Sequence, residues 1–185
     1  MIRAFLFLGL LAALPITSYA ATAVIGGAFR LTDQNGRVVT QASFAGKPML
    51  LYFGYTSCPD ICPVDLARIV RIATSLREKT GVTVTPVFVT VDPERDTPER
   101  MKAYVGAFGP NVVGLTGTRA QIDSIAGEYH VYSKRVPADG GGYLMDHSTM
   151  LFLIGADGVY LDHYGRKAAE QDIVDRAVAK LKTPT

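Results

Sequence analysis

The residues most able to do chemistry in this sequence are its two cysteines. Cys58 and Cys62 form a single Cys-x-x-x-Cys motif in a chain of 185 residues. A thiolate is both a nucleophile and a soft metal ligand, so the motif predicts either a redox dithiol or a soft-metal site, with Cu(I) among the metals selected. A purely structural disulfide is disfavoured, because the loop that it would close is very short. A general thioredoxin-type oxidoreductase is also disfavoured, since it usually carries Cys-x-x-Cys after a tryptophan and this chain has none.

A histidine is the expected third ligand if the cysteines hold a metal, because two sulfurs leave the ion under-coordinated and imidazole also suits copper. Of the three histidines, His147 is favoured, since it follows a glycine-rich loop, precedes an apolar run and has Asp146 beside it. Carboxylates commonly orient metal-bound imidazoles. The alternative for His147 is a buried side chain hydrogen-bonded to Asp146. We expect His163 to be a plain strand residue and His130 to lie on the surface.

The elements around the cysteines predict a corner between a strand and a helix. Residues 49–55 are almost continuously apolar, which is typical of a strand buried on both faces. An amphipathic helix follows and ends at Gly81, with Cys62 in its first turn. Free amide groups and the helix dipole favour a thiolate at such a position.

The rest of the pattern predicts an α/β protein. We expect a β-hairpin over 29–40, strands over 82–91, 112–115, 131–136, 148–154 and 159–164, and helices over 97–108, 118–129 and 168–182. Strands that alternate with helices predict a central mixed sheet flanked by helices on both faces. With an N-terminal β-hairpin and a cysteine motif between strand and helix, this is the layout of a thioredoxin-like fold.

The net charge of the chain and its residues 1–20 indicate the class of partner and the compartment. The net charge of +2 is too small to indicate a nucleic-acid partner. Residues 1–20 have a positive start, an apolar run and small residues at the end, which predicts a secretory signal peptide and an exported protein. Cleavage after residue 23 and an uncleaved membrane anchor are the alternatives. Residues 24–185 are expected to form a single domain.

Four segments of the sequence resemble the Sco/SenC family. They are residues 54–63 (GYTSCPDICP), 90–98 (TVDPERDTP), 146–148 (DHS) and 153–158 (LIGADG). The resemblance spans about residues 28–181 and implies a thioredoxin-like fold, exported to the periplasm or its mitochondrial equivalent. It implies copper bound by Cys58, Cys62 and His147, and a role in assembling the CuA centre of cytochrome c oxidase. Asp60 and Asp146 also match, and we expect them to support the ligands, with helix capping as the alternative for Asp60.

Three functions use the same two cysteines. The favoured one is a copper carrier that delivers to the CuA-bearing subunit of the oxidase, with other copper chaperones or thioredoxin-like reductases as further partners. The alternative is a thiol-disulfide reductase with Cys58 and Cys62 as its catalytic redox pair, and the third is a redox or copper sensor. His147 separates them, because a reductase needs no imidazole ligand. Since Gly140–Gly142 precede His147, we also expect the histidine to be the mobile ligand and the cysteines the fixed pair.

We predict that a Cys58–Cys62 disulfide excludes copper, because the bridge and the metal consume the same thiolates. Protein oxidised to the disulfide should bind copper only after it is reduced. Metal analysis of the two forms after identical exposure to copper and desalting measures the difference. Equal copper content in the disulfide and dithiol forms would contradict the prediction.

Overall fold

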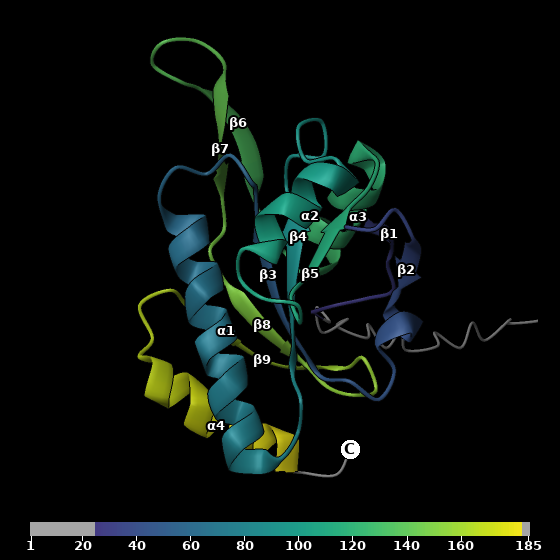
Figure 1. The fold of residues 1–185 in the computed structure, drawn as a ribbon, viewed down its shortest axis with the longest axis vertical. Coiled ribbons are helices and arrows are strands. Elements are labelled where there is room, and N and C mark those ends of the chain that lie inside the picture. The colour runs from purple at the N-terminus through teal and green to yellow at the C-terminus, as the bar shows by residue number, and fades with distance from the viewer. Residues whose placement is uncertain (1–24, 183–185) are drawn as a thin grey trace, which may run out of the picture.

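A mixed sheet of seven strands forms the centre of the computed structural model, which describes residues 25–182 (Figure 1). β3 runs parallel to β4 and antiparallel to β8, and β4 runs parallel to β5. In spatial order the strands are β2 (Val38–Thr40), β1 (Arg30–Asp33), β5 (Val113–Thr116), β4 (Thr85–Thr90), β3 (Met49–Gly54), β8 (Leu151–Ile154) and β9 (Tyr160–Tyr164). The helices of this region are the 3-10 turn η1 (Gln41–Phe44), α1 (Ile61–Thr80), α2 (Pro98–Gly106), α3 (Arg119–Glu128) and α4 (Glu170–Lys182).

Helices cover both faces of this sheet, as the alternation of strands and helices predicted. Tyr52 and Phe88 lie side by side on one face, with ring centroids 6.2 Å apart, and Phe88 packs on Tyr104 of α2. α1 crosses the same face and packs against α4. Phe53 points to the other face, where it contacts Tyr129 just after α3. The thioredoxin-like arrangement expected from the sequence is therefore present.

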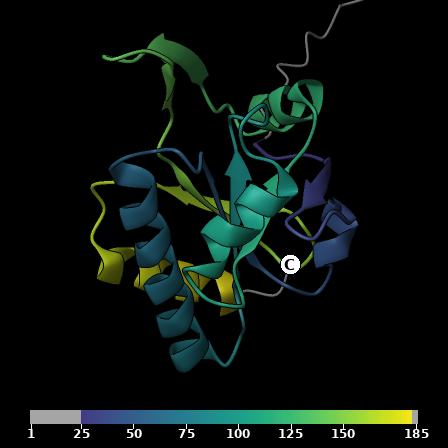
Figure 2. The ribbon, with the colours of Figure 1, turned by 45° about the horizontal axis from the view of Figure 1, so that its top comes forward.

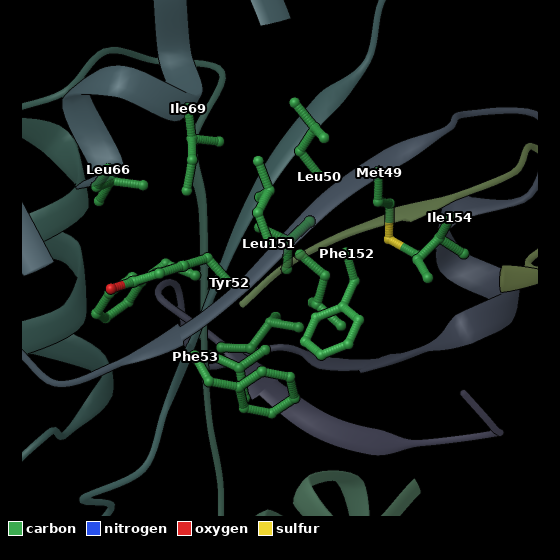
Figure 3. Packing of buried hydrophobic residues seen from close by; sticks show 14 of the residues in the cluster. Met49, Leu50, Tyr52, Phe53, Leu66, Ile69, Leu151, Phe152 and Ile154 are labelled. Atoms are coloured by element: carbon green, nitrogen blue, oxygen red, sulfur yellow. The ribbon is translucent and has the colours of Figure 1, made fainter. Parts of the chain in front are cut away.

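β3 lies at the middle of the hydrophobic core. All six of its residues are buried, which explains why the sequence shows an unbroken apolar run there rather than an alternation. Burial of each large apolar side chain contributes about 1.5–3 kcal/mol relative to an exposed position. Figure 3 shows the side chains of β3 packed among those of β8 and α1, namely Met49, Leu50, Tyr52, Phe53, Leu151, Phe152, Ile154, Leu66 and Ile69.

A separate two-stranded sheet is the main departure from the sequence-based expectation. The strand expected over 131–136 was assigned to the central sheet, but β6 (Ser133–Pro137) pairs with β7 (Tyr143–His147) outside it. β7 was not predicted, and the strand expected over 148–154 begins only at Leu151. β6 is mostly exposed and polar, whereas β7 alternates, with Met145 buried between the exposed Leu144 and Asp146. Neither strand therefore shows the unbroken apolar run of a core strand. The hairpin projects from the body in both views (Figures 1 and 2).

Local sequence signals predicted where most of the other helices and strands begin and end. β1 and β2 form the N-terminal hairpin, and β1 also pairs with β5. The Thr97 side chain accepts a hydrogen bond from the Arg100 amide at the start of α2, and Thr118 and Gln121 form the expected capping box of α3. Gly81 ends α1 in a left-handed conformation with φ of 74°.

The expected signal peptide, its cleavage positions and the alternative anchor lie outside the described residues. Within residues 25–182, no helix has both the length and the apolar character that crossing a membrane requires.

Gly54 ends β3 at a point where a side chain has no room. A Cβ atom there would lie 2.7 Å from Cε2 of Phe88 and 3.1 Å from Sγ of Cys62. Phe88 and Cys62 are fully buried, so neither can move aside without disturbing the core. The glycine therefore reserves the volume that the Cys62 sulfur occupies.

We predict that Gly54→Ala lowers the free energy of unfolding by about 1–3 kcal/mol, because it overpacks this corner. Urea denaturation of the purified chain measures the change. Gly127→Ala is the matched control, since a Cβ on Gly127 of α3 meets nothing within 4 Å. That control should leave stability unchanged or raise it by up to about 1 kcal/mol. Wild-type stability of Gly54→Ala would show that the corner is not tightly packed.

Candidate metal and thiol site

The cysteines lie at the corner between β3 and α1, where the sequence placed them. The amide of Cys58 donates to the carbonyl of Tyr55 at 3.2 Å, which fixes the turn that follows the strand. The amide of Cys62 donates to Sγ of Cys58 at 3.4 Å, so a free amide of the first helical turn faces the first sulfur. Both cysteines are free thiols, with Cys62 fully buried and Cys58 half-buried.

His147 joins the cysteines from the last position of β7. Its Nε2 lies 3.5 Å from Sγ of Cys62, and its Nδ1 lies 2.9 Å from the carbonyl oxygen of Ser148. Because a carbonyl only accepts, Nδ1 carries the proton, and Nε2 presents its lone pair to the thiol of Cys62. The structure thus brings together the three residues predicted as metal ligands, from a turn, a helix and a separate hairpin.

Aromatic rings hold the imidazole of His147 in place. The rings of Tyr52 and Tyr55 meet it edge-on, with centroids 6.5 Å and 5.8 Å away. Tyr52 is itself fixed, because its hydroxyl donates to Oδ2 of Asp65 at 3.0 Å. Nε of Arg166 lies 3.3 Å from the same carboxylate oxygen. The histidine is therefore packed rather than loose, and its ring orientation is set from two sides.

Burial keeps both the thiol of Cys62 and the imidazole of His147 uncharged. Desolvation is the main cause that raises the pKa of Cys62, and the neighbouring Cys58 raises it further. Desolvation also lowers the pKa of His147, although the Ser148 carbonyl, Asp146 and Asp65 act against it. For Cys62, burial therefore opposes the thiolate that the helix start is expected to favour, because it raises the pKa of the thiol.

The acidic neighbours lie away from the three side chains. Asp60 occupies the N-cap position of α1 but is exposed, and its side chain makes no capping hydrogen bond. Asp146 is exposed, because neighbouring residues of a strand face opposite sides and His147 faces inward. The Ser148 carbonyl, rather than Asp146, accepts the hydrogen bond from His147.

The remaining histidines lie elsewhere, as expected. His130 is exposed just after α3, with a positive φ of 52°. His163 is exposed in β9, where its Nδ1 meets the hydroxyl of Tyr160. Across residues 25–182, no three Cys, His, Asp or Glu side chains stand in the arrangement of a preformed metal site. The ligand roles of Cys58, Cys62 and His147 therefore stay a prediction.

A buried carboxylate that the sequence analysis did not single out fixes the approach to Cys58. Asp96 has no exposed surface, and it accepts hydrogen bonds from the amide of Thr56 at 3.0 Å and from its hydroxyl at 2.6 Å. The hydroxyl of Thr90 donates to the same carboxylate at 2.6 Å. Arg100 adds hydrogen bonds to the hydroxyls of Thr56 and Ser57, at 3.0 Å and 2.8 Å. The only sequence signal for Asp96 was its place in the segment 90–98, one of the segments that resemble the family. The resemblance assigned no role to this residue.

The glycine loop lies farther from His147 than its place in the sequence suggested. Gly140–Gly142 form the tip of the hairpin, and all three have positive φ. His147 pairs with Ser133 at the opposite end of the two strands. Flexibility at the tip therefore does not act directly on the histidine, which corrects the reasoning from sequence proximity.

Comparisons with known proteins show which family the sequence is similar to. The family model described as SCO1/SenC matches residues 17–182. A mouse relative, "Protein SCO1 homolog, mitochondrial", is 39% identical over 86% of this chain and 57% of its own length. A SCO2-like protein of Rickettsia felis is 39% identical over 86% of this chain and 78% of its own length. The chain spans about half of the Arabidopsis and human SCO1 homologues that it matches, at 49% and 50% of their lengths.

Solved structures of similar proteins share the fold. Arabidopsis thaliana ScoI, solved with copper bound, superposes with a TM-score of 0.82 at 38% identity, over 84% of this chain and 97% of that one. Yeast Sco1 with copper bound gives a TM-score of 0.80 at 36% identity, over 88% of this chain and 91% of that one. With a family match that covers all the described residues and these likenesses in sequence and fold, the chain belongs to the SCO1/SenC family.

Proposed function

We propose that this protein is a copper carrier that binds the metal through Cys58, Cys62 and His147 and delivers it to the CuA centre of cytochrome c oxidase. The observation that carries the proposal is the 3.5 Å contact between Sγ of Cys62 and Nε2 of His147, with Sγ of Cys58 beside them. The copper-bound structures of the Arabidopsis and yeast relatives support the choice of metal.

The chemistry of the three side chains suits Cu(I) as cargo. Two sulfurs and one imidazole nitrogen form a soft ligand set. Binding removes a proton from each thiol, and Nε2 of His147 needs to lose none because its lone pair is already free. Cys58 is the more exposed of the two cysteines, so the ion arrives and leaves on its side. The two sulfurs and Nε2 of His147 would hold the copper ion between them.

The partner and compartment are parts of the same proposal. The recipient is the CuA-bearing oxidase subunit, and the compartment is the periplasm. The proposed signal peptide at residues 1–20 would direct the protein there. In an oxidising compartment Cys58 and Cys62 would form a disulfide, so a thioredoxin-like reductase is the expected second partner. Another copper chaperone is the expected donor.

A thiol-disulfide reductase is the second candidate, and the unequal exposure of the cysteines favours it. The half-exposed Cys58 as a thiolate attacks a partner disulfide, which yields a mixed disulfide and one partner thiolate. The buried Cys62 then attacks Sγ of Cys58, and its proton passes to the partner sulfur that leaves. The partner leaves as a dithiol, and this protein keeps both oxidised sulfurs as a Cys58–Cys62 disulfide. Such a step would keep the oxidase cysteines reduced so that copper can bind.

We predict that the reduced chain binds one Cu(I) and that Cys58→Ser or Cys62→Ser abolishes tight binding, because one sulfur and one imidazole cannot enclose the ion. Competition against a Cu(I) chelator measures the affinity. His147→Ala should weaken binding by at least about tenfold, in the range that loss of a metal-site partner costs. His163→Ala is the matched control and should bind as the wild type does. Stoichiometric, tight copper in the Cys58→Ser, Cys62→Ser double variant would place the site elsewhere.

The same His147→Ala variant separates carrier from reductase. A carrier with this substitution should lose copper transfer to a soluble CuA domain whose cysteines are already reduced. A reductase should keep reducing an oxidised CuA domain, at a rate within a few-fold of the wild type. Loss of transfer with retained reduction supports the carrier, whereas unchanged metallation by His147→Ala would favour the reductase.

A further inference from the structure

The hairpin of β6 and β7 decides where His147 lies, because the histidine is its last residue. Neither strand pairs with the seven-stranded sheet. The register runs from Ser133 opposite His147 at the base to Pro137 opposite Tyr143 near the tip. The position of His147 relative to Cys62 therefore depends on side-chain contacts that attach the hairpin to the body.

Several of these attachments converge on Tyr143, at the start of β7. Nη1 of Arg95 donates to the Tyr143 carbonyl at 2.9 Å, and its guanidinium lies 3.9 Å from the centroid of the Tyr143 ring. The Tyr143 hydroxyl donates to Oδ1 of Asp92 at 2.9 Å. Asp92 is fully buried and also forms an ion pair with Nε of Arg95. We call this trio of Asp92, Arg95 and Tyr143 the latch.

The latch also touches the cysteine turn. The Arg95 guanidinium lies 5.7 Å from the centroid of the Tyr55 ring, and the same ring meets His147 edge-on. Tyr55 additionally contacts the backbone of Met145, two residues before the histidine. Arg95 therefore stands between the hairpin and the turn that leads to Cys58.

A second ion pair binds the other strand of the hairpin to the same loop. Arg135 of β6 lies 2.9 Å from Glu94, and its guanidinium is 4.6 Å from the Tyr143 ring centroid. Arg119 of α3 also binds Glu94, and together the two arginines lower the pKa of Glu94 to about 2. The loop between β4 and α2 thus contacts both strands.

We propose that Arg95 is a positioning residue, which holds β7 through the latch so that His147 reaches Cys62. This inference rests on the proposed copper site for its functional meaning. Nη2 of Arg95 is buried and has no hydrogen-bond partner in the described residues, which is a cost that a purely stabilising side chain would not carry. This cost is consistent with a guanidinium whose placement holds the hairpin in position rather than adding to overall stability.

The test compares two double variants of the full chain. Asp92→Asn, Arg95→Met removes the latch charges together, so no buried charge is left unpaired. Asp162→Asn, Arg176→Met is the matched control, because Arg176 likewise pairs with a carboxylate, 2.7 Å away, and lies 4.9 Å from the Tyr164 ring centroid. That trio joins β9 to α4 and does not touch the hairpin.

We predict that the latch variant speeds amide hydrogen exchange at residues 143–147 of the apo protein by about tenfold or more, while exchange at residues 58–66 stays near the wild-type rate. Its Cu(I) affinity should fall by about 10–100-fold, the usual effect of losing a residue that orients a ligand. The nitrogen coupling of His147 in the spectrum of bound Cu(II) should weaken. The control variant should change none of these.

Each outcome decides the matter. Wild-type exchange at 143–147 together with wild-type copper affinity in the latch variant would overturn the inference, as would faster exchange spread evenly over the protein. If the wild-type protein binds no copper, the proposed function is wrong. The hydrogen exchange of the apo protein still tests whether the latch positions β7, because it does not depend on copper. If the double variant does not fold, Tyr143→Phe serves instead, since it removes only the hydrogen bond to Asp92. It should raise exchange at 143–147 by a few-fold, and no change there would overturn the inference.

Discussion

The contact between Cys62 and His147 is the interaction on which the rest of the site depends, because it joins two sheets that share no backbone hydrogen bonds. Cys62 belongs to the buried corner of the seven-stranded sheet, whereas His147 ends a hairpin outside it. The hairpin places His147 against the rings of Tyr52 and Tyr55, where its Nε2 meets the buried sulfur of Cys62.

Two buried carboxylates, Asp92 and Asp96, fix the backbone on either side of this site. Asp96 receives the amide and hydroxyl of Thr56, and Asp92 receives the hydroxyl of Tyr143. Both acids are fully buried, yet each is satisfied by donors from the turn or the hairpin. These two side chains therefore hold the backbone on either side of the cysteines.

The sequence was sufficient wherever the signal was local. The apolar run before Cys58, the capping box at Thr118 and the glycine at position 81 each specify their element within a few residues. β7 was missed because it is only five residues long, follows three glycines and has a single buried side chain, Met145. The orientation of His147 was assigned to Asp146 from adjacency, although strand alternation turns neighbours to opposite faces. Contacts such as Arg95 to Tyr143, 48 residues apart, have no local signal at all.

The three glycines at the hairpin tip have a consequence for how this family member can change over evolution. A Cβ at any of them would meet nothing within 4 Å, and the tip lies at the far end of the hairpin from His147. Extra residues inserted there would lengthen the projection without altering the spacing between Tyr143 and His147. The length of the hairpin can therefore change, while the arrangement of the thiols and the imidazole at its base stays the same.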